Sequence, residues 1–259
     1  MGLALITGAS SGIGLELARR FAEHGYDLVI AAEDAEVHVA AQSLGPSGVN
    51  VRPIQVDLRT GKGVEELHRR VSAEGRPLDA AALNAGVGLG GSFIDSTVAD
   101  ALAVVDVNVR STVHLAKLVL PDMVQRRSGK LLFTSSIAST MPGSYQAVYN
   151  ASKSFIQSLS QALHDELRGT GVTVTALMPG PTETNFFRRA GMAGTRMGRM
   201  SHKDDPADVA REGFDALMDG DRKVVAESLL TKAMGIGNRL LPDSVKAAAN
   251  RVMSTPVRS

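Results

Sequence analysis

Tyr149 and Lys153 are four residues apart at the start of a segment whose pattern predicts a helix, Gln146–Arg168. Helix positions four apart lie on one face, so both side chains project in the same direction. A tyrosine with a pKa of about 10 is a poor acid or base at neutral pH, but a neighbouring ammonium favours its phenolate. The pair indicates proton transfer through Tyr149, although most Tyr-x-x-x-Lys pairs are merely neighbours on a helix surface.

Two further polar side chains could join this pair. Ser136 follows the apolar run at 131–135, where its hydroxyl could hydrogen-bond a carbonyl oxygen and orient it toward Tyr149. The alternative for Ser136 is an ordinary serine at a strand end. Asn108 lies between two valines in another long helical segment, Thr97–Arg126, and an amide so placed is usually buried for structural reasons.

A glycine-rich turn, Thr7–Gly14, follows the first apolar run and precedes the helical run Leu15–His24. Glycines allow a tight turn and the close approach of a pyrophosphate, which the free N–H groups and positive end of the new helix attract. Glycine turns of purely structural use are common, so its place between a strand and a helix favours a dinucleotide site. The turn lacks the Lys-[Ser/Thr] ending of a P-loop, which argues against hydrolysis of nucleoside triphosphates.

The elements that must position these residues alternate along the chain. Short apolar or β-branched runs predict strands at Leu3–Thr7, Tyr26–Ala32, Val51–Val56, Leu78–Asn84, Lys130–Ser135, Val172–Met178 and Lys223–Ala226. Alternation with helices predicts right-handed crossovers and a parallel sheet covered on both faces. We expect an α/β fold, a doubly wound, Rossmann-like parallel sheet of about seven strands with helices on both faces. No linker or repeat divides the chain, so a single domain over 1–259 is expected.

The two long helices carry more apolar surface than covering a sheet requires. Gln146–Arg168 has two apolar stripes: Ile156, Leu159, Leu163 and Leu167 form one, and Val148, Ala151, Phe155 and Ala162 form the other. One stripe can face the sheet while the other faces a second subunit, which predicts a homodimer or homotetramer. A helix buried on two sides within the monomer explains the periodicity equally well.

Composition narrows the class of partner. Lysine plus arginine number 28 against 27 aspartate plus glutamate, so the net charge of +1 gives no long-range attraction for nucleic acid or acidic membrane. A small molecule is therefore the expected partner. The absence of cysteine excludes a disulfide framework or thiolate zinc site and favours a cytoplasmic location. The six histidines have no metal-ligand spacing, and no apolar run approaches the ~18 residues of a membrane span, so neither a metal nor a membrane span is expected.

Taken in order, these motifs resemble the standard-length branch of the short-chain dehydrogenase/reductase family over residues 3 to about 185. The resemblance rests on the glycine turn, Asp57-Leu58, Asn84-Ala85-Gly86, the set Asn108, Ser136, Tyr149 and Lys153, and Pro179-Gly180 with Thr184. It implies an oxidoreductase that transfers hydride between a nicotinamide dinucleotide and a ketone, aldehyde or secondary alcohol.

The family pattern also implies a role for each site residue. Tyr149 would donate or accept the proton, and Lys153 would lower its pKa and hold the nicotinamide ribose. Ser136 would steady the substrate oxygen, and Asn108 would hold a water that links Lys153 to solvent. The other residues expected to bind the dinucleotide are Gly8, Ser10, Ser11, Gly12, Ile13, Gly14, Glu33, Asp57, Leu58, Asn84, Ala85, Gly86, Pro179, Gly180, Thr182 and Thr184.

The choice between NAD and NADP departs from the family pattern. The aspartate typical of NAD users would fall at Ala32, and the arginine typical of NADP users at Glu33. Glu33 or Asp34 would repel a 2′-phosphate and could accept a hydrogen bond from a 2′-hydroxyl, which favours NAD.

Two segments near the end of the chain remain open. Glycines and methionines between Phe186 and Met200 predict a substrate lid over about 183–202, and its arginines either meet an anionic substrate or form a solvated basic face. A helical tail over about 229–259 has a basic side, but packing over the substrate cleft or a partner is simpler than membrane contact.

The alternative function is a dinucleotide-sensing or scaffold protein, which would not need Ser136 and Tyr149.

Overall fold

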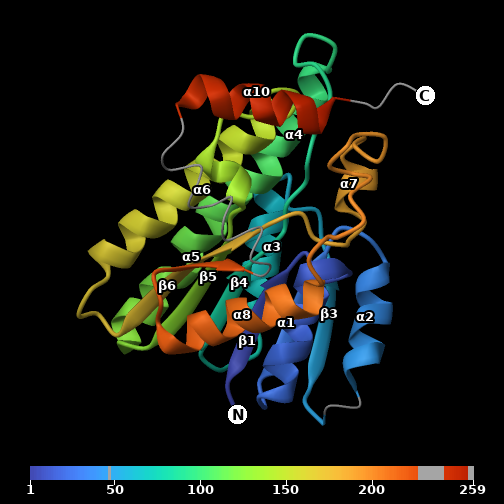
Figure 1. The fold of residues 1–259 in the computed structure, drawn as a ribbon. Helices are drawn as coiled ribbons and strands as arrows, with labels where there is room; N and C mark the ends of the chain where they lie inside the picture. Colours follow the sequence, from blue (N-terminus) through green and yellow to red (C-terminus); the bar gives the residue numbers. More distant parts are fainter. Residues whose placement is uncertain (46–47, 227–241, 256–259) are drawn as a thin grey trace.

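The computed structural model describes residues 1–45, 48–226 and 242–255, and within them seven parallel strands form one sheet. The strand order is β3-β2-β1-β4-β5-β6-β7, which reverses direction between β1 and β4. This architecture confirms the expected doubly wound sheet (Figure 1). The strands are β1 (Leu3–Thr7), β2 (Asp27–Ala32), β3 (Val51–Gln55), β4 (Ala80–Leu83), β5 (Gly129–Thr134), β6 (Val172–Pro179) and β7 (Lys223–Ala226).

Alternation along the buried strands divides the core into two layers. Ala4 and Ile6 of β1 pack with helices α1, α2 and α8, whereas Leu3 and Leu5 pack with α3, α5 and α6 on the opposite face. The helices are α1 (Gly12–Glu23), α2 (Glu36–Leu44), α3 (Gly61–Ser72), α4 (Val98–Val105), α5 (Ser111–Arg126), α6 (Ala147–Glu166), α7 (Phe186–Arg189), α8 (Pro206–Asp219) and α10 (Asp243–Ser254).

The first long helix is not uniform. A π-helical turn, Asp106–Arg110, joins α4 to α5 and contains Asn108. Sequence reasoning expected one continuous helix over Thr97–Arg126, and the structure interrupts its α-helical ladder at the polar residue singled out there. A π-turn re-aims side chains locally, and such turns are frequent at functional sites.

The second long helix has one buried and one solvent-facing side. Ile156 is buried against the sheet, and Leu163 and Leu167 pack against the same core. Phe155 of the second predicted stripe remains 46% exposed, and Ala151 and Ala162 are also exposed. The second stripe is therefore not covered within the described part of this chain.

The C-terminal segment returns to the carboxyl end of the sheet. Helix α10 lies across the top of α6 and α4 in Figure 1. The expected tail over 229–259 is therefore helical where it is described, and its residues 229–241 and 256–259 lie outside the described residues. No helix among the described residues is long and apolar enough to cross a membrane.

Candidate active site

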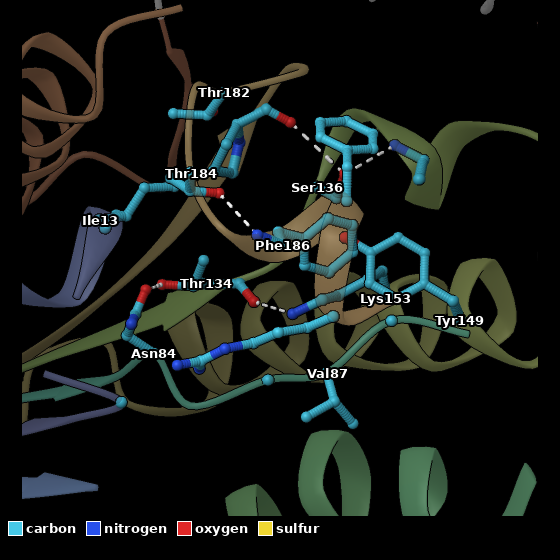
Figure 2. Close-up of a pocket in the computed structure, with 18 of the residues that line it drawn as sticks. Ile13, Asn84, Val87, Thr134, Ser136, Tyr149, Lys153, Thr182, Thr184 and Phe186 are labelled. Carbon is cyan, nitrogen blue, oxygen red and sulfur yellow. Dashed lines mark hydrogen bonds between the residues drawn. The ribbon is translucent and has the colours of Figure 1, made fainter. Parts of the chain in front are cut away.

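One cavity of about 740 Å³ opens at the carboxyl ends of the strands, where the strand order reverses. The glycine turn, the ends of β2, β4, β5 and β6, and the first turns of α6 line it from the sheet side. The segment around α7 and one face of α10 complete the wall. The close-up in Figure 2 shows side chains from the glycine turn, the ends of β4 and β5, α6 and the segment around α7 converging on one space.

Tyr149 and Lys153 both line this cavity from α6. Lys153 Nζ donates to the carbonyl oxygen of Thr134 at 2.8 Å and lies 5.9 Å from the centre of the Tyr149 ring. The hydroxyl of Ser135 donates to the carbonyl of Lys153 at 2.9 Å. These bonds fix α6 against the end of β5, so the predicted pairing of tyrosine and lysine is present in the fold.

The protonation states differ from the sequence-based expectation. Burial raises the pKa of the Tyr149 phenol to about 12, although a hydrogen bond with Ser136 partly opposes the rise. Burial also lowers the pKa of Lys153 to about 8. The expectation that the ammonium holds the tyrosine pKa below its usual range is wrong for the protein alone, because removal from water dominates and only the hydrogen bond with Ser136 opposes it.

Ser136 lies at the end of β5, with its hydroxyl directed into the cavity beside Tyr149 (Figure 2). Its Oγ accepts from the backbone N–H of Ala138 at 3.1 Å and is 3.4 Å from the carbonyl oxygen of Pro179. These contacts orient the serine hydroxyl from both sides. A substrate oxygen placed between Ser136 and Tyr149 would meet two hydroxyl groups.

Asn108 does not line the cavity but contacts Ser152 of α6, the helix that carries Tyr149. Its Nδ2 donates to the carbonyl of Val87 and to Ser152 Oγ, both at 2.9 Å. Its Oδ1 accepts from the backbone N–H of Val87 at 2.8 Å. The amide thus holds the segment after β4 against α6, and the expected water contact of Asn108 stays a prediction.

The glycine turn forms a cradle that a side chain would fill. Gly8 has φ +66°, and a Cβ added there would lie 2.8 Å from the Cα of Ala85. A Cβ at Gly14 would lie 2.1 Å from the carbonyl oxygen of Gly8. Helix α1 begins at this turn, so its unpaired N–H groups and positive end face the cavity. A pyrophosphate group fits this chemistry.

Acidic side chains line the cavity rim beyond β2. Asp34 Oδ2 accepts from Ser10 Oγ at 3.2 Å and lies 3.4 Å from Arg189 Nη2, which belongs to α7. The other oxygen of Asp34 is buried and has no hydrogen-bond partner. Glu33, in contrast, is 53% exposed and lies 3.9 Å from Arg59. Asp34 is therefore the better placed of the two to accept from a ligand hydroxyl.

The cavity brings together every residue that the sequence assigned to dinucleotide binding and, of the four assigned to catalysis, all except Asn108. Phe186 and Arg189, which also line the cavity, lie in the segment predicted as a substrate lid, and the lining residues of α10 belong to the predicted helical tail. The Phe186 ring centre lies 5.2 Å from that of Tyr149. The glycines and arginines of the predicted lid pointed to the segment around α7, and packing over the substrate cleft was one of the two arrangements expected for the tail that contains α10, although no individual residue of that helix was named. Among the described residues there is no group of three or more potential metal ligands.

Comparison with known proteins identifies the family. The sequence model of the short chain dehydrogenase family matches residues 2–193 of this chain. The chain belongs to this family. This short-chain dehydrogenase is 35% identical over 213 residues to oxidoreductase UcpA of Salmonella typhimurium, covering 81% of this chain and 77% of the relative.

Two further comparisons bear on the cofactor of this short-chain dehydrogenase. It is 33% identical over 180 residues to the NADP-dependent 3-hydroxy acid dehydrogenase YdfG of Salmonella typhi, covering 69% of this chain and 71% of the relative. Its fold matches a short-chain dehydrogenase from Sphingobium yanoikuyae in complex with NADPH, with a TM-score of 0.82 and 28% identity, covering 100% and 97% of the two chains. The chain is thus an oxidoreductase built to use a nicotinamide dinucleotide.

Proposed function

We propose that this short-chain dehydrogenase transfers hydride between a nicotinamide dinucleotide and a ketone, an aldehyde or a secondary alcohol, with Tyr149 as the proton donor or acceptor. The observation that carries the proposal is the convergence of Ser136, Tyr149 and Lys153 in the cavity that also contains the glycine cradle. A sensor protein would need the cradle but not the two buried hydroxyl groups. We also propose a cytoplasmic location, because a chain without cysteine forms no disulfide that would need an oxidising compartment.

The side chains of this protein would divide the work. Ser136 and Tyr149 would hydrogen-bond the substrate oxygen, and Tyr149 Oη would give its proton to that oxygen during reduction. A pKa of about 12 keeps the phenol protonated at neutral pH, which suits the reductive direction. Lys153 would bind the nicotinamide ribose and, when charged, would stabilise the phenolate that proton transfer leaves behind.

The dinucleotide would occupy the remaining length of the cavity. Its pyrophosphate would lie on the glycine turn, with the adenosine near Asp34 and Asp57 and the nicotinamide near Pro179 and Thr184. When bound, this cofactor supplies or accepts the hydride.

We favour NAD over NADP for this chain. Asp34 and Glu33 both line the adenosine end, and a carboxylate there repels a 2′-phosphate. Arg59, the nearest candidate to neutralise that phosphate, already pairs with Asp57 at 2.9 Å. The two relatives described above are NADP-associated and give no support to NAD, so the preference proposed for this chain rests on its own acidic residues.

The deciding experiment follows the absorbance of reduced nicotinamide with a panel of ketones and secondary alcohols. We expect turnover by the wild-type protein, and Tyr149→Phe should reduce kcat at least a thousandfold while leaving the dinucleotide dissociation constant within about threefold, because only the ionisable oxygen is lost. Dinucleotide binding without turnover of any substrate would instead support the sensor. Substantial turnover by Tyr149→Phe would contradict the role of the tyrosine.

A further inference from the structure

Helix α10 supplies the outer wall of the cavity. Lys246, Ala249, Asn250 and Met253, on one face of this helix, are among the lining residues. Gln146 Nε2 donates to Ser254 Oγ at 2.7 Å, and Asn250 Nδ2 donates to the carbonyl of Ser144 at 3.1 Å. Both partners precede Tyr149 by a few residues, so α10 is fastened directly to the start of the catalytic helix.

The same helix is fastened to the segment that follows α7. The backbone N–H of Met197 donates to the carbonyl of Met253 at 3.0 Å, and both side chains line the cavity. With contacts at two separate points of the rim, α10 holds its inward side chains in fixed positions. The lysine among them is therefore part of a defined wall rather than a freely moving surface group.

Charge is distributed unevenly along the cavity. The acidic lining residues Glu33, Asp34 and Asp57 belong to the end that would hold adenosine. Arg189 is held beside Asp34, and Lys153 faces Thr134 and Tyr149. On the wall formed by α10, Lys246 is the one charged side chain among the described lining residues.

Lys246 is poorly solvated for a lysine of a surface helix. Its side chain is 11% exposed, whereas its partner Asp243 is 78% exposed. Lys246 Nζ donates to Asp243 Oδ1 at 2.9 Å, which uses one of its three N–H donors. The Asp243 carboxylate can leave the ammonium for water at a small cost in free energy, because it is already largely hydrated. An incoming anion could then use the ammonium.

The surfaces beside Lys246 are apolar. Ala249 and Met253 of α10 and Met141 and Met197 of the facing segments line this part of the cavity. A hydrogen bond from an ammonium to an oxyanion is strengthened where apolar side chains displace water. An apolar chain bearing one carboxylate matches this combination of surfaces.

We propose that Lys246 binds a carboxylate of the substrate, remote from the reacting carbon, so that the preferred substrates are oxo acids and hydroxy acids with an apolar body. This inference rests on the proposed oxidoreductase function and narrows its substrate class. Ser136 and Tyr149 take the reacting oxygen, and Lys246 takes the other end of the molecule.

The test compares 4-oxopentanoate, 6-oxoheptanoate and 8-oxononanoate with their methyl esters, which keep the same oxo chain but carry a methyl group in place of the negative charge. For at least one chain length we expect kcat/KM of the wild-type enzyme to be about tenfold or more higher for the acid. Lys246→Met should raise KM for that acid about 10- to 100-fold, the range expected for a lost charged hydrogen bond, and leave the ester unchanged. Lys246→Arg should retain most of the preference, because the positive charge remains.

Two further variants serve as controls. Arg251→Met removes an exposed positive charge from the same helix at a position that does not line the cavity, and it should leave the acid preference intact. Asp243→Asn should leave KM for the acid unchanged or lower it, because the ammonium of Lys246 loses the carboxylate that competes with the substrate. Equal kcat/KM for acids and esters in the wild type, or equal losses in Lys246→Met and Arg251→Met, would overturn the inference.

A binding measurement separates this inference from the proposed function. Heptanoate and heptan-1-ol are titrated by calorimetry into the protein saturated with dinucleotide. Tighter binding of heptanoate that disappears in Lys246→Met supports the carboxylate site even if no ketone is turned over. Equal affinity of wild type and Lys246→Met for heptanoate refutes it even if ketones are reduced.

Discussion

Tyr149 and Lys153 share one physical circumstance, because removal from water favours the uncharged form of each. The pKa of the phenol rises from 10.0 to about 12 and that of the ammonium falls from 10.5 to about 8, so their ordinary order is reversed and the two values move apart. Proton transfer from the phenol therefore depends on a lysine whose pKa lies only about one unit above neutral pH. Residues that supply charge or hydration near Lys153 will control the rate.

The buried lysine predicts how stability changes with pH. Since the pKa of Lys153 falls from 10.5 to about 8 on folding, the unfolded chain keeps a proton that the folded chain releases between these values. The free energy of unfolding should then rise with pH from about 8 to 10, with a slope approaching about 1.4 kcal/mol per pH unit. The raised pKa of Tyr149 contributes a fall only above about pH 10.

Denaturant unfolding of wild type and Lys153→Met at several pH values checks this slope. The variant lacks the titrating group, so the free energy of unfolding of the wild type should rise relative to that of the variant as pH rises through 8 to 10. A difference that stays constant over this window would show that Lys153 has an ordinary pKa in the fold.

The adenosine end predicts a difference between two neighbouring carboxylates. Asp34 has a buried oxygen without a partner, whereas Glu33 is directed to Arg59 and solvent. Asp34→Asn should weaken NADH binding about tenfold, equivalent to about 1.4 kcal/mol, and reduce discrimination against NADPH. Glu33→Gln should change either affinity less than threefold. Fluorescence titration with NADH and NADPH measures these affinities. If Glu33→Gln changed them more than Asp34→Asn, Glu33 and not Asp34 would determine the cofactor preference.

At the scale of elements, the segment around α7 contacts the end of the cavity beyond β2. Arg189 of α7 pairs with Asp34, and both residues line the cavity. Arg189→Gln should speed dissociation of the reduced dinucleotide two- to fivefold, as the loss of a partly exposed ion pair of up to about 1 kcal/mol allows. Stopped-flow fluorescence gives the rate. Arg188→Gln, an exposed neighbour that does not line the cavity, should leave it unchanged.

The elements also show what the sequence could and could not determine. The spacing of Tyr149 and Lys153 specifies their proximity, because a helix repeats every 3.6 residues wherever it lies. Seven apolar runs specify parallel strands, because both faces of such a sheet are buried. Asp34 and Arg189 are far apart in the chain, and no local pattern records their contact. The position of α10 likewise depends on side chains of Gln146 and Ser254 that meet only in the fold.

At the scale of the whole molecule, the uncovered stripe on α6 predicts self-association. Phe155 is 46% exposed, and Leu102 and Val105 of the other long helix are also exposed. Apolar side chains gathered on long helices mark a contact surface in soluble proteins. Light scattering should return at least twice the chain mass of 27.2 kDa. Phe155→Glu should shift the protein toward the monomer, and Glu166→Gln, at an exposed position on the same helix, should not. A wild-type monomer at micromolar concentration would contradict the prediction.

The route by which α10 reaches the cavity has a consequence for the order of events during synthesis. The residues expected to hold the dinucleotide all precede residue 185, whereas the wall that carries Lys246 comes from 243–254. A ribosome adds these last residues several seconds after the cofactor half has emerged, at about 5–20 residues per second. The wall that carries Lys246 is therefore synthesised after every residue expected to hold the dinucleotide, and the two ends of the cavity are completed in that order.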